Sequence, residues 1–313
     1  MPLLADYALT PDVFDPTSYS NEEVCGLHLG ALKEVLLAEG LVRDLRMSEW
    51  RRIFSDGSRP WHQRGKELIK KLAAQGRLIS FAPTLPASPS DDRGWCAEAL
   101  GTQAQSAISG GIIVTESVKT AFEDEPLVAQ IDKLEKTPWW TSRSPSIRLG
   151  RTTVDYQAHL APVLRSANSI MFIDPHLDPT KHGYREFGQL LARVSGRTPV
   201  PTLELHRVCY EGSGPGRAIL GRADIESRFR RGLEAQVRAA GLRIEVFVWD
   251  DFHDRYLVSN ILGILVPYGF DTTVDPKSVT TWTRLGQDTR DDVQREFDTA
   301  SGRHTLRHQF TIP

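Results

Sequence analysis

The spacing of apolar residues becomes regular in the second half of the chain, from about Thr153 onward. Residues 169–174, SIMFID, are almost wholly apolar, which is typical of a strand buried on both faces. One set of apolar residues recurs every four positions and predicts an amphipathic helix: Ile225, Phe229, Leu233 and Val237. The elements expected in order are helices over 154–166, 184–194 and 225–240, and strands over 169–174, 202–209 and 243–249, with two short β runs in 256–266. This alternation predicts a mixed sheet with helices on both faces.

The first 80 residues show helical periodicity instead. Ser20 and Glu23 form a capping box in front of an apolar-periodic segment, residues 24–38. A second helix is expected over 63–74, and 78–81 has the composition of a short strand. Helices followed by a strand fit a winged helix, and they equally fit plain helical packing, so both interpretations stay open.

The middle of the chain suggests where the domains divide. Residues 83–111 are rich in Pro, Ser, Gly and Ala, which predicts a linker or a long irregular loop. A strand over 112–115 and a helix over 127–136 are expected after it. We therefore expect an α-rich N-terminal module over 1–140 and an α/β domain over 141–313.

Composition narrows the class of protein without assigning a function. At 313 residues, 40% hydrophobic and 25% charged, the chain has the make-up of a soluble globular protein of one large or two ordinary domains. Its net charge of −2 argues neither for nor against a nucleic-acid ligand. Three scattered cysteines form no disulfide framework and no metal-ligand spacing, which favours a reducing compartment. Without a signal peptide or an apolar run of about 20 residues, a cytoplasmic, bacterial protein is expected.

The candidate chemistry lies in residues 248–271, VWDDFHDRYLVSNILGILVPYGFD. Its core is His253-Asp254-Arg255, followed after four residues by Asn260. This arrangement resembles the signature of the phospholipase D superfamily, which is His-x-Lys, four residues and Asp, with glycine shortly after. Arginine stands here where lysine is usual, and asparagine where aspartate is usual.

The resemblance is closer to one branch, the phospholipase-D-like domain found C-terminal to microtubule-interacting-and-transport modules, which also has His-Asp-Arg. Shared features are Asp174-Pro175 after the first strand, Gly241-Leu242 before the third, and the Gly269-Phe270-Asp271 step. The match covers about residues 150–313. The N-terminal half does not resemble the transport-associated module, so the partners of that module are not expected here.

The resemblance implies a role for each residue of the motif. His253 would be the nucleophile toward phosphorus, Arg255 would hold the nonbridging oxygens, and Asn260 would replace the usual carboxylate support. Superfamily catalysis uses two such motifs, and this chain has one; His176 follows the first strand but lacks a lysine two residues on. Either two chains share a site across a two-fold axis, or the site binds without cutting.

Other polar groups add a possible phosphate surface. Arg228 and Arg231 lie on the basic face of the helix expected over 225–240 and are the best candidates for further phosphate contacts. His304 and His308 are four residues apart, but the segment around them alternates like a strand, so no metal site and no cofactor are expected.

These observations give two functional hypotheses. The first is a phosphodiester-recognising protein that binds nucleic acid, as a possible homodimer and metal-independent nuclease, with protein partners in a bacterial anti-phage defence system. The second is a catalytically inactive scaffold that binds phospholipid headgroups or a protein partner. Nuclease and scaffold differ in whether His253 attacks a phosphodiester.

Overall fold

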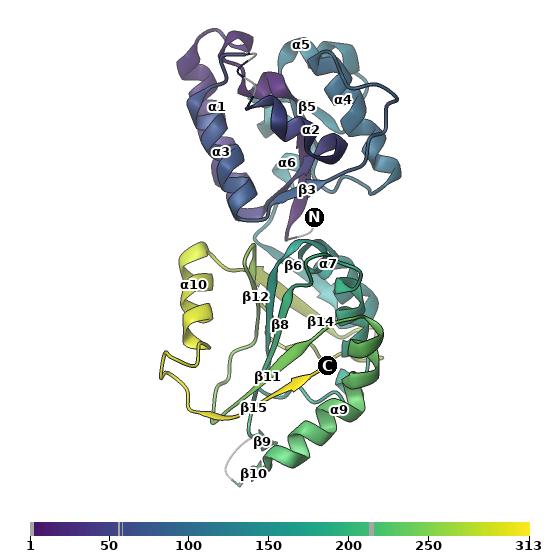
Figure 1. The fold of residues 1–313 in the computed structure, drawn as a ribbon, viewed down its shortest axis with the longest axis vertical. Coiled ribbons are helices and arrows are strands. Elements are labelled where there is room, and N and C mark those ends of the chain that lie inside the picture. The colour runs from purple at the N-terminus through teal and green to yellow at the C-terminus, as the bar shows by residue number, and fades with distance from the viewer. Residues whose placement is uncertain (1–2, 56, 58, 213–215) are drawn as a thin grey trace. The chain divides into compact units, whose positions relative to one another are not determined.

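The computed structural model describes residues 3–55, 57, 59–212 and 216–313. The chain divides into two compact units, Met1–Ser144 and Pro145–Pro313, each with its own sheet (Figure 1). The sequence placed this division near residue 140. Within the described residues, no helix is long and apolar enough to cross a membrane.

The first unit is built on a parallel five-stranded sheet in the order β3-β2-β1-β4-β5. Its strands are β1 (Ala5–Leu9), β2 (Gly40–Asp44), β3 (Leu78–Ser80), β4 (Ile112–Val114) and β5 (Val128–Gln130). Its helices are α1 (Glu22–Glu39), α2 (Leu45–Ile53), α3 (Gln63–Ala74), α4 (Asp92–Gly101), α5 (Glu116–Lys119) and α6 (Pro138–Thr141). Figure 1 shows α1 and α3 on one side of this sheet and α4 and α5 on the other.

The parallel sheet corrects three expectations for this half. Neither the winged helix nor plain helical packing describes this half, because short strands such as β1 and β2 pair in a parallel sheet. The linker expected over 83–111 contains α4, which Asp91 caps by accepting a hydrogen bond from Gly94 N. Residues 127–136 form β5 and a 3₁₀ turn instead of an α-helix.

The second unit has a mixed eight-stranded sheet in the order β15-β11-β8-β7-β12-β13-β14-β6. Its strands are β6 (Ser146–Gly150), β7 (Ser169–Ile173), β8 (Thr202–Val208), β11 (Ile244–Trp249), β12 (Tyr256–Ser259), β13 (Gly263–Leu265), β14 (Val279–Arg284) and β15 (Leu306–Ile312). A separate small hairpin consists of β9 (Tyr210–Glu211) and β10 (Ala218–Ile219). Strands β7, β8 and β11 run parallel, whereas β12 runs antiparallel to β7.

Helices cover both faces of this sheet, which confirms the predicted fold class. They are α7 (Thr153–Ser166), α8 (Phe187–Leu191), α9 (Arg222–Ala239) and α10 (Gln287–Glu296). Figure 1 shows α10 on one side of the sheet and α7 and α9 on the other. All four apolar residues of the α9 repeat are buried, as the four-residue spacing predicted. On the other face, Phe297 at the end of α10 packs edge-on against the His206 and Trp249 rings.

Candidate functional site at the carboxyl edge of the second sheet

The strand directions bring the motif to one edge of the sheet. Tyr256, the first residue of β12, pairs with Ile173, the last residue of β7. The segment 253–255 therefore lies beside the residues that follow β7, and the ends of the parallel strands β8 and β11 lie at the same edge. We call this edge, where the parallel strands β7, β8 and β11 end, the carboxyl edge. In open α/β sheets, ligands bind at the carboxyl ends of the parallel strands.

Asp174 organises this edge from a fully buried position. Its carboxylate accepts hydrogen bonds from His176 N (3.0 Å), Tyr184 Oη (2.9 Å) and Phe270 N (3.1 Å). Burial raises the pKa of Asp174, and these backbone donors and the Arg255 charge oppose that shift. The carboxylate thus joins the segment after β7 to the segment between β13 and β14, and Arg255 lies against it.

Gly269 shows how tightly these groups are packed. Its φ of +69° is a conformation that favours glycine, and a Cβ there would collide with the Asp174 carboxylate. The same Cβ would lie 3.1 Å from Arg255 Cδ. Glycine at this position lets the chain turn directly over the Asp174–Arg255 pair.

Arg255 and His253 lie in the segment before β12, and their side chains are in different settings. The Arg255 side chain is 26% exposed; its Nε is 3.7 Å from Asp174 Oδ1 and its Nη1 donates to Pro267 O at 3.2 Å. His253 is exposed, and so is Asp254, which accepts a hydrogen bond from Tyr256 Oη at 3.2 Å. Arg255 is therefore oriented by the protein, whereas His253 sits at the surface of the edge.

A pocket of about 240 Å³ opens at this edge. It is lined by His176, Lys181, Tyr184, Arg207, Tyr210, Glu211 and Gly212. Lys181 follows β7, Arg207 belongs to β8, and Tyr210 and Glu211 form β9. Residues 213–215 of the glycine-rich segment 211–217 lie outside the described residues.

Arg207 is the most buried cation of this pocket, with 3% exposure. Its Nε donates to Val208 O at 2.8 Å and its Nη2 to Tyr210 O at 3.1 Å. Its Nη1 is buried and has no hydrogen-bond partner among the described residues. Burial lowers the pKa of Arg207, so this guanidinium is held at a cost in free energy.

His176 stands in the middle of these charges. Burial lowers the pKa of this half-buried imidazole; Asp174 opposes the shift, and the nearby charges of Arg255, Arg207 and Lys181 lower the pKa further. The ring is consequently neutral near pH 7, the form that can accept a proton or attack phosphorus. Sequence reasoning gave His176 only a minor place and missed Lys181 and Arg207, although Asp174-Pro175-His176 directly follows an apolar strand.

Asn260 does not belong to this site, which corrects the role expected for it. It follows the far end of β12, where its Oδ1 accepts hydrogen bonds from Asn168 N (2.7 Å) and Ser169 N (3.3 Å) at the start of β7. The four residues of β12 lie between it and Arg255, so the two positions are five residue steps apart, about 16 Å of extended chain at about 3.3 Å per residue. Arg255 and Asn260 therefore lie at opposite ends of β12. Asn260 links the end of β12 to the start of the neighbouring strand β7.

The basic face of α9 is largely neutralised by carboxylates. Arg228 Nη1 lies 2.9 Å from Asp178 Oδ2 and 3.0 Å from Glu211 Oε2, which joins it to the rim of the pocket. Arg231 is exposed on the same helix. Further arginines of α9 pair with glutamates one turn away: Arg222 and Arg230 with Glu226, and Arg230 and Arg238 with Glu234. Of the two phosphate contacts expected from α9, Arg228 is therefore near the site but already paired.

Metal ligands are not grouped in the described part of the chain: no three His, Cys, Asp or Glu side chains there could hold one ion. His304 Nε2 instead lies 2.8 Å from Glu296 Oε1. His308 lies in strand β15, as its alternating pattern predicted.

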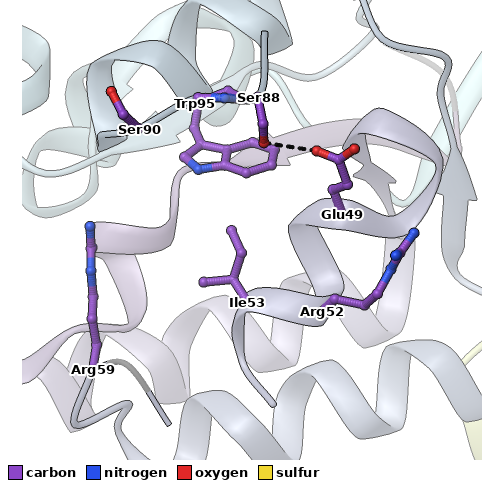
Figure 2. Close-up of a pocket in the computed structure, with 8 residues that line it drawn as sticks. Glu49, Arg52, Ile53, Arg59, Ser88, Ser90 and Trp95 are labelled. Carbon is purple, nitrogen blue, oxygen red and sulfur yellow. Dashed lines mark hydrogen bonds between the residues drawn. The ribbon is translucent and has the colours of Figure 1, made fainter. Parts of the chain in front are cut away.

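The first unit contains a larger cavity, of about 550 Å³. Figure 2 shows Trp95 facing Ile53 across it, with Arg52 and Arg59 on opposite sides. Each of its charged side chains already has a partner: Glu49 bonds to Ser88 (2.9 Å), Arg59 to Asp92 (2.9 Å), and Arg52 to backbone carbonyls. The carboxyl edge of the second unit, with its unpaired Arg207 nitrogen, is the stronger candidate.

Comparisons with known proteins give only distant likenesses. No protein-family model and no curated protein matches the chain. A phospholipase D family member, Nuc from Salmonella typhimurium, aligns at 10% identity over 52% of this chain and 99% of its own, with a TM-score of 0.31.

Two further solved structures align at the same level. The archaeal chromatin protein TrmBL2, whose structure shows a novel mode of DNA binding, aligns at 10% identity over 77% of this chain and 81% of its own, with a TM-score of 0.30. Polyphosphate kinase from Porphyromonas gingivalis aligns at 15% identity over 50% of this chain and 23% of its own, with a TM-score of 0.31. At these scores the three likenesses carry no argument about the site, which rests on its own geometry.

Proposed function

We propose that the unit Pro145–Pro313 recognises phosphate esters at its carboxyl edge and that its ligand is a nucleic acid. One observation carries this proposal: Lys181 and Arg207 line one pocket with His176, and Arg255 lies against Asp174, the carboxylate that accepts a hydrogen bond from His176 N. Carboxylates that would neutralise these three cations are few and specific, Glu211 for Lys181 and Asp174 for Arg255.

The chemistry of the three cations suits phosphate oxygens. Guanidinium groups present two parallel N–H donors that match two oxygens of a phosphate, and an ammonium adds a point charge. Arg255 is held against Asp174 but remains partly exposed, so its outer N–H groups are available to a ligand. A surface of this kind binds the phosphates of nucleic acid with a strong dependence on salt.

We extend the proposal to phosphodiester cleavage, with His253 as nucleophile. Its imidazole nitrogen would form a bond to phosphorus while the ester P–O bond breaks, and the departing oxygen would take a proton from a second group. Water would then cleave the phosphohistidine bond and regenerate the imidazole. The neutral His176 at the same edge can accept the proton of this water within one chain, whereas a homodimer would supply a second histidine to protonate the departing oxygen.

A non-catalytic scaffold is the second candidate, and one observation favours it. Among the described residues, no hydrogen bond orients the exposed His253 ring, and Asn260 lies too far away to do so. An unoriented imidazole is a poor nucleophile, because catalysis needs the attacking atom held in line. A cytoplasmic place in a bacterial anti-phage system is a further proposal that rests on the resemblance alone.

The test uses the full chain with fluorescent single- and double-stranded DNA and RNA in EDTA. Binding that weakens by about 1.5–3 kcal/mol in Arg255→Gln and is kept in Arg295→Gln, an exposed arginine of α10, supports phosphate recognition at this edge. Cleavage that disappears in His253→Ala while binding persists supports the nuclease; binding without any cleavage leaves the scaffold. Absence of binding to every nucleic acid at low salt would overturn the proposal.

A further inference from the structure

We propose that the pocket around Arg207 takes a terminal phosphate, so that the protein recognises a phosphorylated strand end in preference to the interior of a strand. This inference rests on the proposed function, since it names which phosphate of the ligand enters the pocket. The ligand class is a nucleic-acid phosphomonoester.

The first step is the free donor on Arg207. Two of its three guanidinium nitrogens are fixed by the carbonyls of Val208 and Tyr210. The third, Nη1, is buried without a partner among the described residues, in a side chain that lines the pocket. Buried charged donors are nearly always satisfied, so an orphaned one at a pocket indicates that the missing acceptor comes from a ligand.

The second step is the shape of the pocket. Arg207 is 3% exposed and Tyr184 is 8% exposed, so both contribute to its inner wall rather than to its mouth. The Tyr184 hydroxyl is already bonded to Asp174, which fixes this part of the wall. A phosphodiester in the interior of a DNA strand is bonded to the nucleic-acid chain on both sides, and both sides must leave the pocket. A terminal phosphate is bonded to the chain on one side only. Because the deepest donor of this pocket is almost fully buried, the pocket fits a terminal phosphate better than an interior phosphodiester.

The third step is charge. Glu211 lies on the rim, with Oε1 2.7 Å from Lys181 Nζ and Oε2 3.0 Å from Arg228 Nη1. A bound phosphate must therefore compete with this carboxylate for Lys181. A phosphomonoester carries about −1.5 to −2 charges near pH 7, against about −1 for a diester, and competes better. The neutral His176 beside it adds a hydrogen-bonding group without repelling either form.

The experiment compares three versions of one short single-stranded DNA with the full chain in EDTA: a 5′-phosphate, a 3′-phosphate, and hydroxyls at both ends. Fluorescence anisotropy gives each affinity. We expect one phosphorylated end to bind about tenfold or more tightly than the hydroxyl form. Arg207→Gln should abolish that preference, and the control Arg295→Gln, at an exposed arginine of α10, should keep it.

The outcomes of this experiment separate the inference from the proposed function. Equal affinity for all three strands overturns the inference while leaving phosphate recognition intact. No binding of any DNA strand overturns the proposed function. In that case, a rise in Tm with inorganic phosphate that Arg207→Gln abolishes would still support an anion pocket at Arg207. No rise in Tm with inorganic phosphate would overturn the anion pocket as well. Because Arg207→Gln can destabilise the unit, Glu211→Gln provides a second variant. Removing the competing carboxylate should strengthen binding of the phosphorylated strand, and unchanged or weaker binding contradicts the competition.

Discussion

Gly269→Ala is the substitution that most directly tests the packing beneath the site. Two costs are expected. A φ of +69° in a non-glycine residue costs about 1–2 kcal/mol, and the new Cβ must displace the buried Asp174 carboxylate, an overpacking cost of about 1–3 kcal/mol. The free energy of unfolding of the second unit should therefore fall by about 2–5 kcal/mol.

The chain supplies a matched control in Gly302→Ala. Gly302 has nearly the same φ, +68°, but nothing lies within 4 Å of the position of its Cβ, so only the backbone cost applies. At about 3 °C per kcal/mol for a unit of this size, Tm should drop by roughly 3–6 °C in the control and by roughly 6–15 °C in Gly269→Ala. Scanning calorimetry of the full chain measures both. A Gly269→Ala variant no less stable than Gly302→Ala would refute the packing around Asp174.

Further predictions concern pH and the far end of β12. Burial lowers the pKa of His206, opposed by Glu204, so the unfolded chain takes up the proton first and stability is lost as pH falls below about 6.5. His206→Gln should flatten the Tm profile between about pH 7 and about pH 5, and an unchanged profile would contradict this assignment. Asn260→Ala should cost about 1–2 kcal/mol of stability through the lost bonds to Asn168 and Ser169. The same variant should leave affinity for DNA unchanged; weakened binding in a folded variant would return Asn260 to the site.

Several features of the second unit could be predicted from the sequence because they depend on local pattern. The apolar run of β7 and the four-residue repeat of α9 have a periodicity that only one kind of element satisfies. Expected bounds were close to those observed, as for the helix expected over 154–166 and observed as α7 over Thr153–Ser166.

The remaining features depend on contacts between distant segments. Residues 78–81 and 112–115 were expected as strands, but β1, β2 and β5 were not. Strand β5 has three residues, too few for a periodicity to develop, so the parallel sheet of the first unit was not recognised. Lys181 and Arg207 come together only because β7 and β8 are parallel neighbours. Asn260 was assigned by its spacing from His253, and spacing along an extended strand separates residues instead of joining them.

The salt dependence of binding tests the central claim most directly. For single-stranded DNA, the logarithm of the association constant should fall with the logarithm of salt concentration by about 0.7 per phosphate contact. If Arg255 holds a phosphate, the slope measured for Arg255→Gln should be shallower than that of the unsubstituted chain by about 0.7, while Arg295→Gln keeps the original slope. Identical slopes for all three proteins would contradict phosphate recognition by Arg255 at the carboxyl edge.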